Sequence, residues 1–222
     1  MNKFARIRKY LSMREPVNAW THFLTFLAAI VGLVLLIILT AGNVAKLITM
    51  TIYGSSVIIL FGASSVYHWA QVRPRVVLIL KKIDHIAIYF LIAGSATPVF
   101  YHGLTGIWQW IMLGGIWGLA IIGALLKVWF INLPRYISTA FYLSLGWIAI
   151  IPIAQLVANL PLGAIMLMVL GGVFYSIGAI IYATRCFNFF PNHFGFHEIF
   201  HLFVTAGTIS HFSMVLFYLV PL

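Results

Sequence analysis

Four residues that could do chemistry stand out in this chain because almost everything around them is apolar. They are three histidines and one aspartate: His68, Asp84, His197 and His201. His197 and His201 are four residues apart, so on a helix they share one face and can bind the same ion. Three neutral imidazoles plus a water form the ligand set of an open zinc site. The pattern therefore predicts a Zn²⁺ site in which His68 joins the pair.

Two polar groups are expected next to this metal. An ionised carboxylate at membrane depth costs roughly 2.5–3.5 kcal/mol on insertion scales, and a dication held by neutral ligands needs compensating charge. We therefore expect Asp84 beside the metal-bound water, where it can take and return a proton, and Ser64 one helical turn from His68 near the same point. Two other interpretations stay open. Asp84 could cap its helix or pair with Lys81 or Arg73, and Ser64 could bond to its own helix backbone.

A short motif offers a competing interpretation of the same histidines. The stretch from His197 to His201 fits H-E-x-x-H, in which the glutamate is the general base of a zinc protease. Glu198 points about 100° around a helix from His197, so it could approach the water or face a neighbouring helix. We favour Asp84 as the base and expect Glu198 to support the site.

The composition indicates a polytopic membrane protein. Of 222 residues, 63% are hydrophobic and 7% are charged, and the mean hydropathy is +1.08. The thirteen Lys and Arg residues outnumber the three acids. They lie in short stretches between apolar runs, which favours orientation signals over nucleic-acid binding. The single cysteine, Cys186, excludes an internal disulfide and a cysteine-rich zinc knuckle.

Seven apolar runs of the length needed to cross a bilayer predict an all-α fold, a seven-transmembrane helix bundle. The fifth run is the least regular because Pro152 lies inside it, although membrane helices can tolerate proline. No linker or soluble domain is evident, so we expect one domain over residues 1–222. The predicted spans are 18–40, 46–69, 83–101, 107–129, 136–156, 161–183 and 196–220.

The distribution of cations predicts the orientation of the bundle. Twelve of the thirteen cations would lie on one face if these spans alternate, and positive charge stays cytoplasmic. The N-terminus, including a basic segment over residues 1–17, is expected inside and the C-terminus outside, in a multi-pass protein of the cell membrane. The twelve are Lys3, Arg6, Arg8, Lys9, Arg14, Arg73, Arg75, Lys81, Lys82, Lys127, Arg135 and Arg185; the exception is Lys46.

Two further features bear on packing. Glu15, Asn18 and His22 are spaced by three and four, so they form a polar stripe that can bond a loop or support the metal ligands. A helix-start role for Asn18 is the alternative, and His22 is not expected to be a ligand. A group of glycines in the fourth span would allow close helix contact within the chain or in a homo-oligomer: Gly114, Gly115, Gly118 and Gly123.

Taken in order along the chain, these motifs resemble a known family. The stretch from Glu15 to His22, Ser64-x-x-x-His68, Asp84 and His197-x-x-x-His201 resemble the signature of the progestin and adiponectin receptor family, and the short chain is most similar to its hemolysin III branch. The resemblance implies a seven-helix bundle with zinc on the three histidines. The wider superfamily includes alkaline ceramidases, which hydrolyse a lipid amide. Receptor members more often carry Gln at the position of Glu198, which implies that an acid there is dispensable.

Three functions are compatible with these observations. The first is a zinc-dependent hydrolase acting on an amide or ester of a membrane lipid or fatty-acyl substrate, which enters from the bilayer, with a role in lipid homeostasis. The second is a receptor-like sensor of membrane lipids in which zinc is structural. The third is a pore-forming hemolysin, which a polar stripe through the full thickness of several spans would favour. Such a stripe is missing from the sequence.

Overall fold

A computed structural model describes residues 13–190 and 194–222. Within these ranges the regular secondary structure is helical, apart from one isolated β-bridge between Phe190 and Phe194. The predicted all-α class is therefore confirmed there, while residues 1–12 of the expected basic segment lie outside the described residues. The elements are α2 (Pro16–Thr40), α3 (Val44–Trp69), α4 (Pro74–Gly103), α5 (Gly106–Trp129), α6 (Arg135–Gly146), η1 (Trp147–Ile150), α7 (Ile153–Asn159), α8 (Leu162–Thr184), α9 (Phe196–Met214) and the π-helical η2 (Val215–Leu219).

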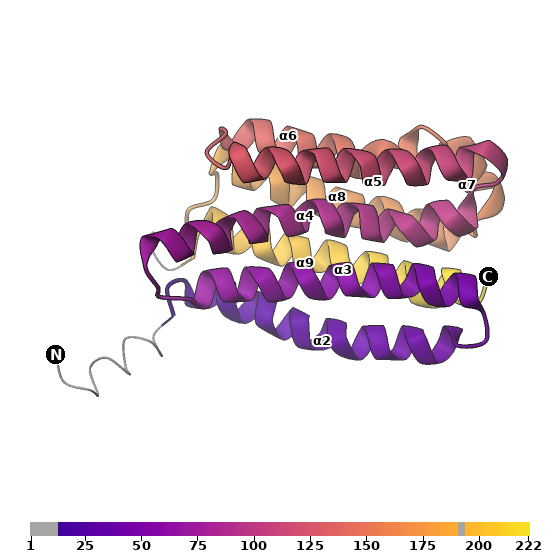
Figure 1. Cartoon of the computed structure of the whole chain (residues 1–222), viewed down its shortest axis with the longest axis horizontal. Coiled ribbons are helices and arrows are strands. Elements are labelled where there is room, and N and C mark those ends of the chain that lie inside the picture. The colour runs from indigo at the N-terminus through magenta and orange to yellow at the C-terminus, as the bar shows by residue number, and fades with distance from the viewer. Residues whose placement is uncertain (1–12, 191–193) are drawn as a thin grey trace.

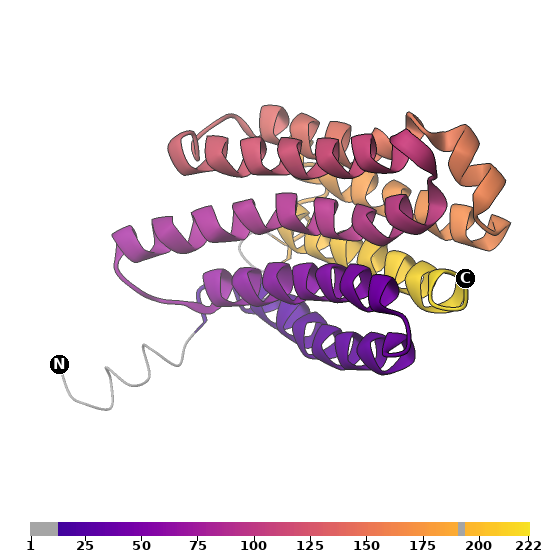
Figure 2. The same cartoon turned by 45° about the vertical axis from the view of Figure 1, so that its right-hand side comes forward.

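The helices run along one common direction and form a bundle. Figure 1 shows α2 and α3 along one side, α5 and α6 along the opposite side, and α4 and α9 between them; the turned view in Figure 2 keeps this order. α3 ends where α4 and α9 begin, at the left of Figure 1. We call this the histidine end, because His68, His197 and His201 belong to these helix termini.

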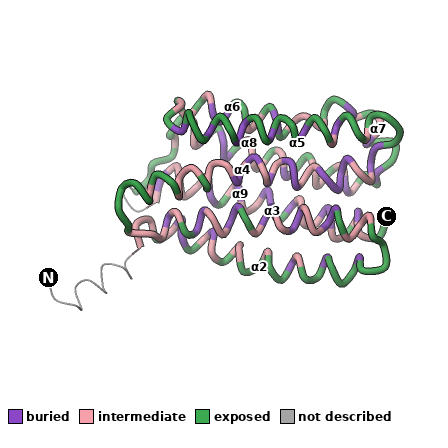
Figure 3. The backbone as a smooth tube through the Cα atoms, in the orientation of Figure 1, coloured by how far each residue is buried: buried purple, intermediate pink, exposed green. Residues whose placement is uncertain are grey.

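The outer faces of the bundle are apolar and exposed. In α2, for example, the exposed fractions are 70% for Val31 and 67% for Ile38, and Figure 3 shows exposed residues along the outer helices and buried residues facing inward. Within residues 13–190 and 194–222, five helices are long and apolar enough to cross a membrane, or six if the bent pair Arg135–Ile150 and Ile153–Asn159 counts as one span. The predicted number of seven crossings and the predicted orientation stay predictions.

Two predicted spans differ from the structure. α4 begins at Pro74 rather than at residue 83, because proline suits a first helical turn. Asp84 therefore lies in the third turn and does not cap the helix. The fifth predicted span is not continuous, since the helix breaks at Ile151 and Pro152 and bends by 53°. Pro152 has no N–H to continue the ladder of hydrogen bonds.

The glycines of α5 divide into two groups. A Cβ on Gly123 would overlap the ring of Tyr89 on α4, so this glycine allows close packing inside the bundle. Gly114, Gly115 and Gly118 face open space. The expected intramolecular role thus applies to Gly123, and a homo-oligomer stays a prediction.

Candidate metal centre

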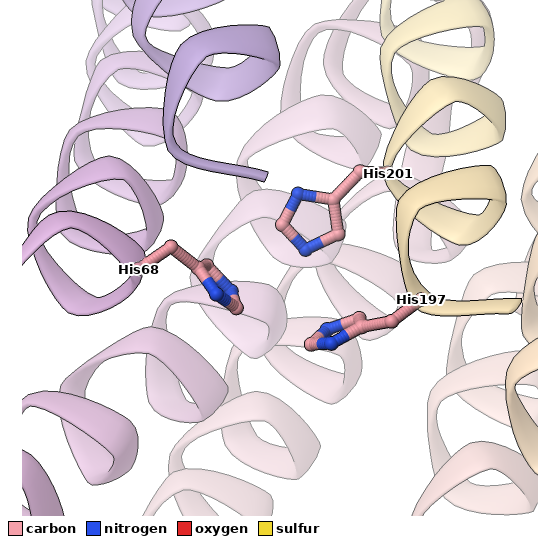
Figure 4. Close-up of side chains that lie close together, drawn as sticks. All are labelled: His68, His197 and His201. Atoms are coloured by element: carbon pink, nitrogen blue, oxygen red, sulfur yellow. The ribbon is translucent and has the colours of Figure 1, made fainter. Parts of the chain in front are cut away.

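The three predicted histidines come together at the histidine end. Figure 4 shows His68 from α3 and His197 and His201 from α9 pointing toward one another. One ring nitrogen of each lies within 4.8 Å of the others. The ring centroids are 4.7 Å apart for His68 and His201, and 4.9 Å apart for His197 and His201. The three nitrogens are thus close enough to share one ion, and histidine nitrogens would bind zinc at about 2.0–2.1 Å.

The hydrogen bonding of His68 fits a metal ligand. Its Nδ1 lies 2.7 Å from Oε2 of Glu15, so the ring donates this proton to the carboxylate. The Nε2 of His68 is buried and has no hydrogen-bond partner among the described residues. A ligating histidine usually donates its other N–H to a carboxylate, and the unmet buried nitrogen is then the one that faces the metal. Zn²⁺ or another divalent ion that accepts imidazole fits this donor set.

Three polar residues form a hydrogen-bonded chain beside the histidines. The buried amide of Asn18 donates to Oε2 of Glu15 at 3.1 Å and to Oε1 of Glu198 at 2.9 Å. The backbone N–H of Gly195 donates to Oε2 of Glu198 at 2.8 Å. Both oxygens of Glu198 are therefore engaged in joining the start of α2 to the start of α9. This arrangement fits the predicted supporting place of Glu15, Asn18 and Glu198 better than a proteolytic role for Glu198.

The backbone delivers Glu15 to His68. Its N–H donates to the carbonyl of His68 at 3.0 Å, and the N–H of Arg14 donates to the carbonyl of Trp69 at 3.3 Å. Partial burial alone would raise the pKa of Glu15, but the hydrogen bonds from His68 and Asn18 and the electrostatic interaction with the imidazoles of His68 and His197 outweigh it and lower the pKa to about 2. Glu15 therefore stays ionised at neutral pH.

His22 lies closer to the site than the sequence indicates. Its ring stacks on that of His201 with centroids 3.8 Å apart and planes 17° apart. Both of its nitrogens are buried and have no hydrogen-bond partner within the described ranges. In the sequence, the only indication of this position was the spacing of His22 from Asn18 and Glu15, which places the three residues on one face at the start of α2. Its stacked ring fixes the orientation of His201.

A cavity of about 620 Å³ opens beside the histidines and runs between the helices. His197 and His201 line it together with Ser64 and Asp84. The hydroxyl of Ser65 bonds back to the carbonyl of Phe61 at 2.7 Å. Ser64 behaves differently, because its Oγ is buried and meets no partner in the part of the chain that is described. The backbone-bonding alternative therefore applies to Ser65 and not to Ser64.

Asp84 makes no ion pair with Lys81 or Arg73 among the described residues, where the ion pairs found all involve Glu15. It lies outside the three-histidine group as well. The structure thus places Asp84 on the cavity wall, where its carboxylate pairs with neither Lys81 nor Arg73. Its catalytic role stays a prediction.

These features define a class: an α-helical membrane protein with a cluster of three histidines, two of which line a cavity between the helices. A family model described as Haemolysin-III related matches residues 10–212. Hemolysin-3 of Bacillus cereus is 35% identical over 99% of this chain and 97% of its own length. The Hemolysin-3 homolog of Bacillus subtilis is 37% identical over 93% of this chain and 94% of its own length. The human monocyte to macrophage differentiation factor is 27% identical over 96% and 93% of the two chains.

The chain therefore belongs to the haemolysin-III related family, within the progestin and adiponectin receptor family. It is an integral membrane protein with several apolar membrane-spanning helices. The resemblance found in the motifs is confirmed over essentially the whole chain.

Proposed function

We propose that this protein is a zinc-dependent membrane hydrolase that cleaves an amide or ester bond of a membrane lipid and acts in lipid homeostasis. The observation that carries the proposal is that two histidines of the cluster, His197 and His201, line a largely apolar cavity. Its volume of about 620 Å³ is within the range of about 300–1,000 Å³ common for ligand sites. Leu60, Ile88 and Leu91 are among the residues that could hold an acyl chain.

The residues of the cavity support the chemistry of acyl transfer to water. Zinc held by the three histidines would polarise the carbonyl and lower the pKa of water to about 7. Asp84 would accept the proton of the attacking water and return it to the leaving group. Ser64, whose hydroxyl has no other use among the described residues, would donate to the developing oxyanion. Glu15 would hold the ring of His68 in its orientation through Nδ1.

The open character of the cluster favours catalysis over a structural ion. In the described residues the group contains three protein ligands, all histidines, and a fourth position open to the cavity is typical of catalytic zinc. A receptor-like lipid sensor needs the ion only to tie α3 to α9. The relatives named Hemolysin-3 suggest a pore as a further possibility. The apolar wall residues away from the histidine end fit an acyl chain better than a column of water.

Elemental analysis and lipid turnover test the proposal together. Protein purified in detergent without added metal should hold about one zinc per chain, and His68→Ala should lose it. His102→Ala is the matched control, because His102 bonds to Thr49 at 3.0 Å and lies outside the cluster. Wild-type protein should release fatty acid from a panel of ceramides, phospholipids and acyl amides, and Asp84→Asn should retain zinc and lose release. Zinc-loaded wild type that releases nothing from the panel would overturn the hydrolase assignment.

A further inference from the structure

A second group of polar side chains lines the histidine end of the cavity, and the proposed chemistry does not use it. Lys81, Lys127 and Arg135 come from three different helices, α4, α5 and the start of α6, and all three line the cavity. Ser138 and Thr139 line the cavity beside them. Three cations therefore line the same cavity.

Lys127 is the most unusual member, because it is buried. Its side chain is 3% exposed, and its Nζ donates to Oγ of Ser138 at 2.5 Å. A long lysine near a membrane boundary normally extends its ammonium to the polar interface. Lys127 instead keeps its charge inside the protein, with a neutral hydroxyl as the partner. A buried charge of this kind is costly unless an opposite charge compensates it.

Arg135 also has a buried donor, Nη1, without a hydrogen-bond partner among the described residues. The guanidinium lies over the rings of Tyr182 and Phe196, at 5.1 and 5.2 Å from their centroids. Tyr182 also contacts His197, with ring centroids 5.4 Å apart. A group bound by Arg135 would thus lie near the histidine cluster.

The protein supplies too little negative charge to compensate these cations. The chain has three acids. Glu15 is bonded to His68, Asn18 and Arg14, and Glu198 is bonded to Asn18 and Gly195. Glu15 and Asp84 both line the cavity, but Glu15 is paired with Arg14. Asp84 is therefore the one acid left to compensate the three cations, which leaves an excess of two positive charges.

We propose that Lys81, Lys127 and Arg135 bind the phosphate group of a membrane phospholipid whose acyl chains occupy the apolar part of the cavity. The inference rests on the proposed function in taking this lipid as the substrate, but its binding needs no turnover. Phosphate fits better than a carboxylate, because three cations and two hydroxyl groups offer more donors than two carboxylate oxygens can accept. The apolar wall of the cavity favours a lipid over a free anion.

Native mass spectrometry of the full chain can test the inference with two lipids that differ only in the phosphate. Dioleoyl phosphatidic acid and dioleoylglycerol are offered in equal amounts, and retained lipid is counted. Wild type should prefer the phosphate-bearing lipid on the order of tenfold, which corresponds to about 1.4 kcal/mol. Lys127→Met and Arg135→Gln should lose this preference.

The matched control is Lys82→Met, which removes a cation next to Lys81. Lys82 donates to the carbonyl of Val128 at 2.6 Å and is not part of the cavity wall. This variant should keep the preference. Zinc content and melting temperature report whether each variant is folded, and Lys81→Gln carries the test if Lys127→Met does not fold.

The outcomes separate this inference from the proposed function. Asp84→Asn, which should not turn lipid over, should still prefer phosphatidic acid. A wild type that hydrolyses lipid yet retains both lipids equally would overturn the phosphate site alone. An equal loss of preference in Lys82→Met would overturn it as well, since surface charge would then explain the binding. Inorganic phosphate that raises the melting temperature of wild type, but not of Lys127→Met, without any lipid preference would overturn the assignment to a lipid.

Discussion

Glu15 and His68 are hydrogen-bonded through both their side chains and their backbones. Oε2 of Glu15 lies 2.7 Å from Nδ1 of His68, and the N–H of Glu15 lies 3.0 Å from the carbonyl oxygen of His68. The double connection fixes the carboxylate against the imidazole. The Nε2 of the same ring is thereby directed at the other two histidines.

Glu15→Gln should weaken metal binding without unfolding the protein. A glutamine amide cannot match the charge-assisted bond to the ring of His68, and losing such a partner typically costs about 10–100-fold in metal affinity. Competition with a chelator of known affinity measures the change. Lys82→Met serves as the control for a lost charge, because Lys82 donates to the carbonyl of Val128 and not to Glu15. Unchanged affinity in Glu15→Gln would show that the ring of His68 does not depend on this acid.

Glu198→Gln should cost stability rather than activity. Each oxygen of Glu198 accepts one hydrogen bond, from Asn18 and from the backbone of Gly195, and glutamine keeps one acceptor. We expect a loss of about 1 kcal/mol in the free energy of unfolding, measured by thermal denaturation in detergent. Zinc content and any lipid release should stay near the wild-type values. A loss of release of 100-fold or more, of the order that a general base contributes, would instead make Glu198 the base.

Two substitutions of His22 separate packing from ligation. His22→Phe retains an aromatic ring against His201 and should keep the metal. His22→Ala leaves a cavity behind His201 and should destabilise the protein by about 2 kcal/mol or more, with weaker metal binding. Zinc analysis and thermal denaturation measure both effects. If His22→Phe lost zinc as completely as His201→Ala, His22 would be a ligand.

Glycine substitutions in α5 test the packing of α4 against α5. Gly123→Ala places a Cβ against the ring of Tyr89 and should cost about 1–3 kcal/mol through overpacking. Gly118→Ala meets open space on the same helix and should leave stability unchanged or raise it by up to about 1 kcal/mol, because alanine is the better helix former. Melting temperatures in one detergent compare the two. Equal effects would contradict the packing of Gly123 against Tyr89.

The sequence predicts the helices and the histidine cluster well for physical reasons. Long apolar runs have one stable form in a bilayer, and His197 and His201 share a face by helical periodicity alone. The meeting of His68 with that pair follows once α3 ends where α9 begins. The start of α4 is harder to predict, because the charged turns before Asp84 look like a loop on a hydropathy criterion.

Tertiary contacts account for what the sequence does not reveal. From the sequence, Lys127 is interpreted as an orientation signal between two spans. In the fold it is buried and donates a hydrogen bond to Ser138. The stacking of His22 on His201 depends on how α2 packs against α9, and no local pattern encodes that contact. The engagement of both oxygens of Glu198 likewise requires Asn18, which is 180 residues away in the chain.

The order of the histidines along the chain has a consequence for biogenesis. Two of the three nitrogens that converge belong to α9, which leaves the ribosome after helices α2 to α8, while the acid that orients the third lies at the start of α2. A nascent chain cannot close this centre until α9 has inserted beside α2. Loading with metal would therefore mark the molecules in which α9 is in place.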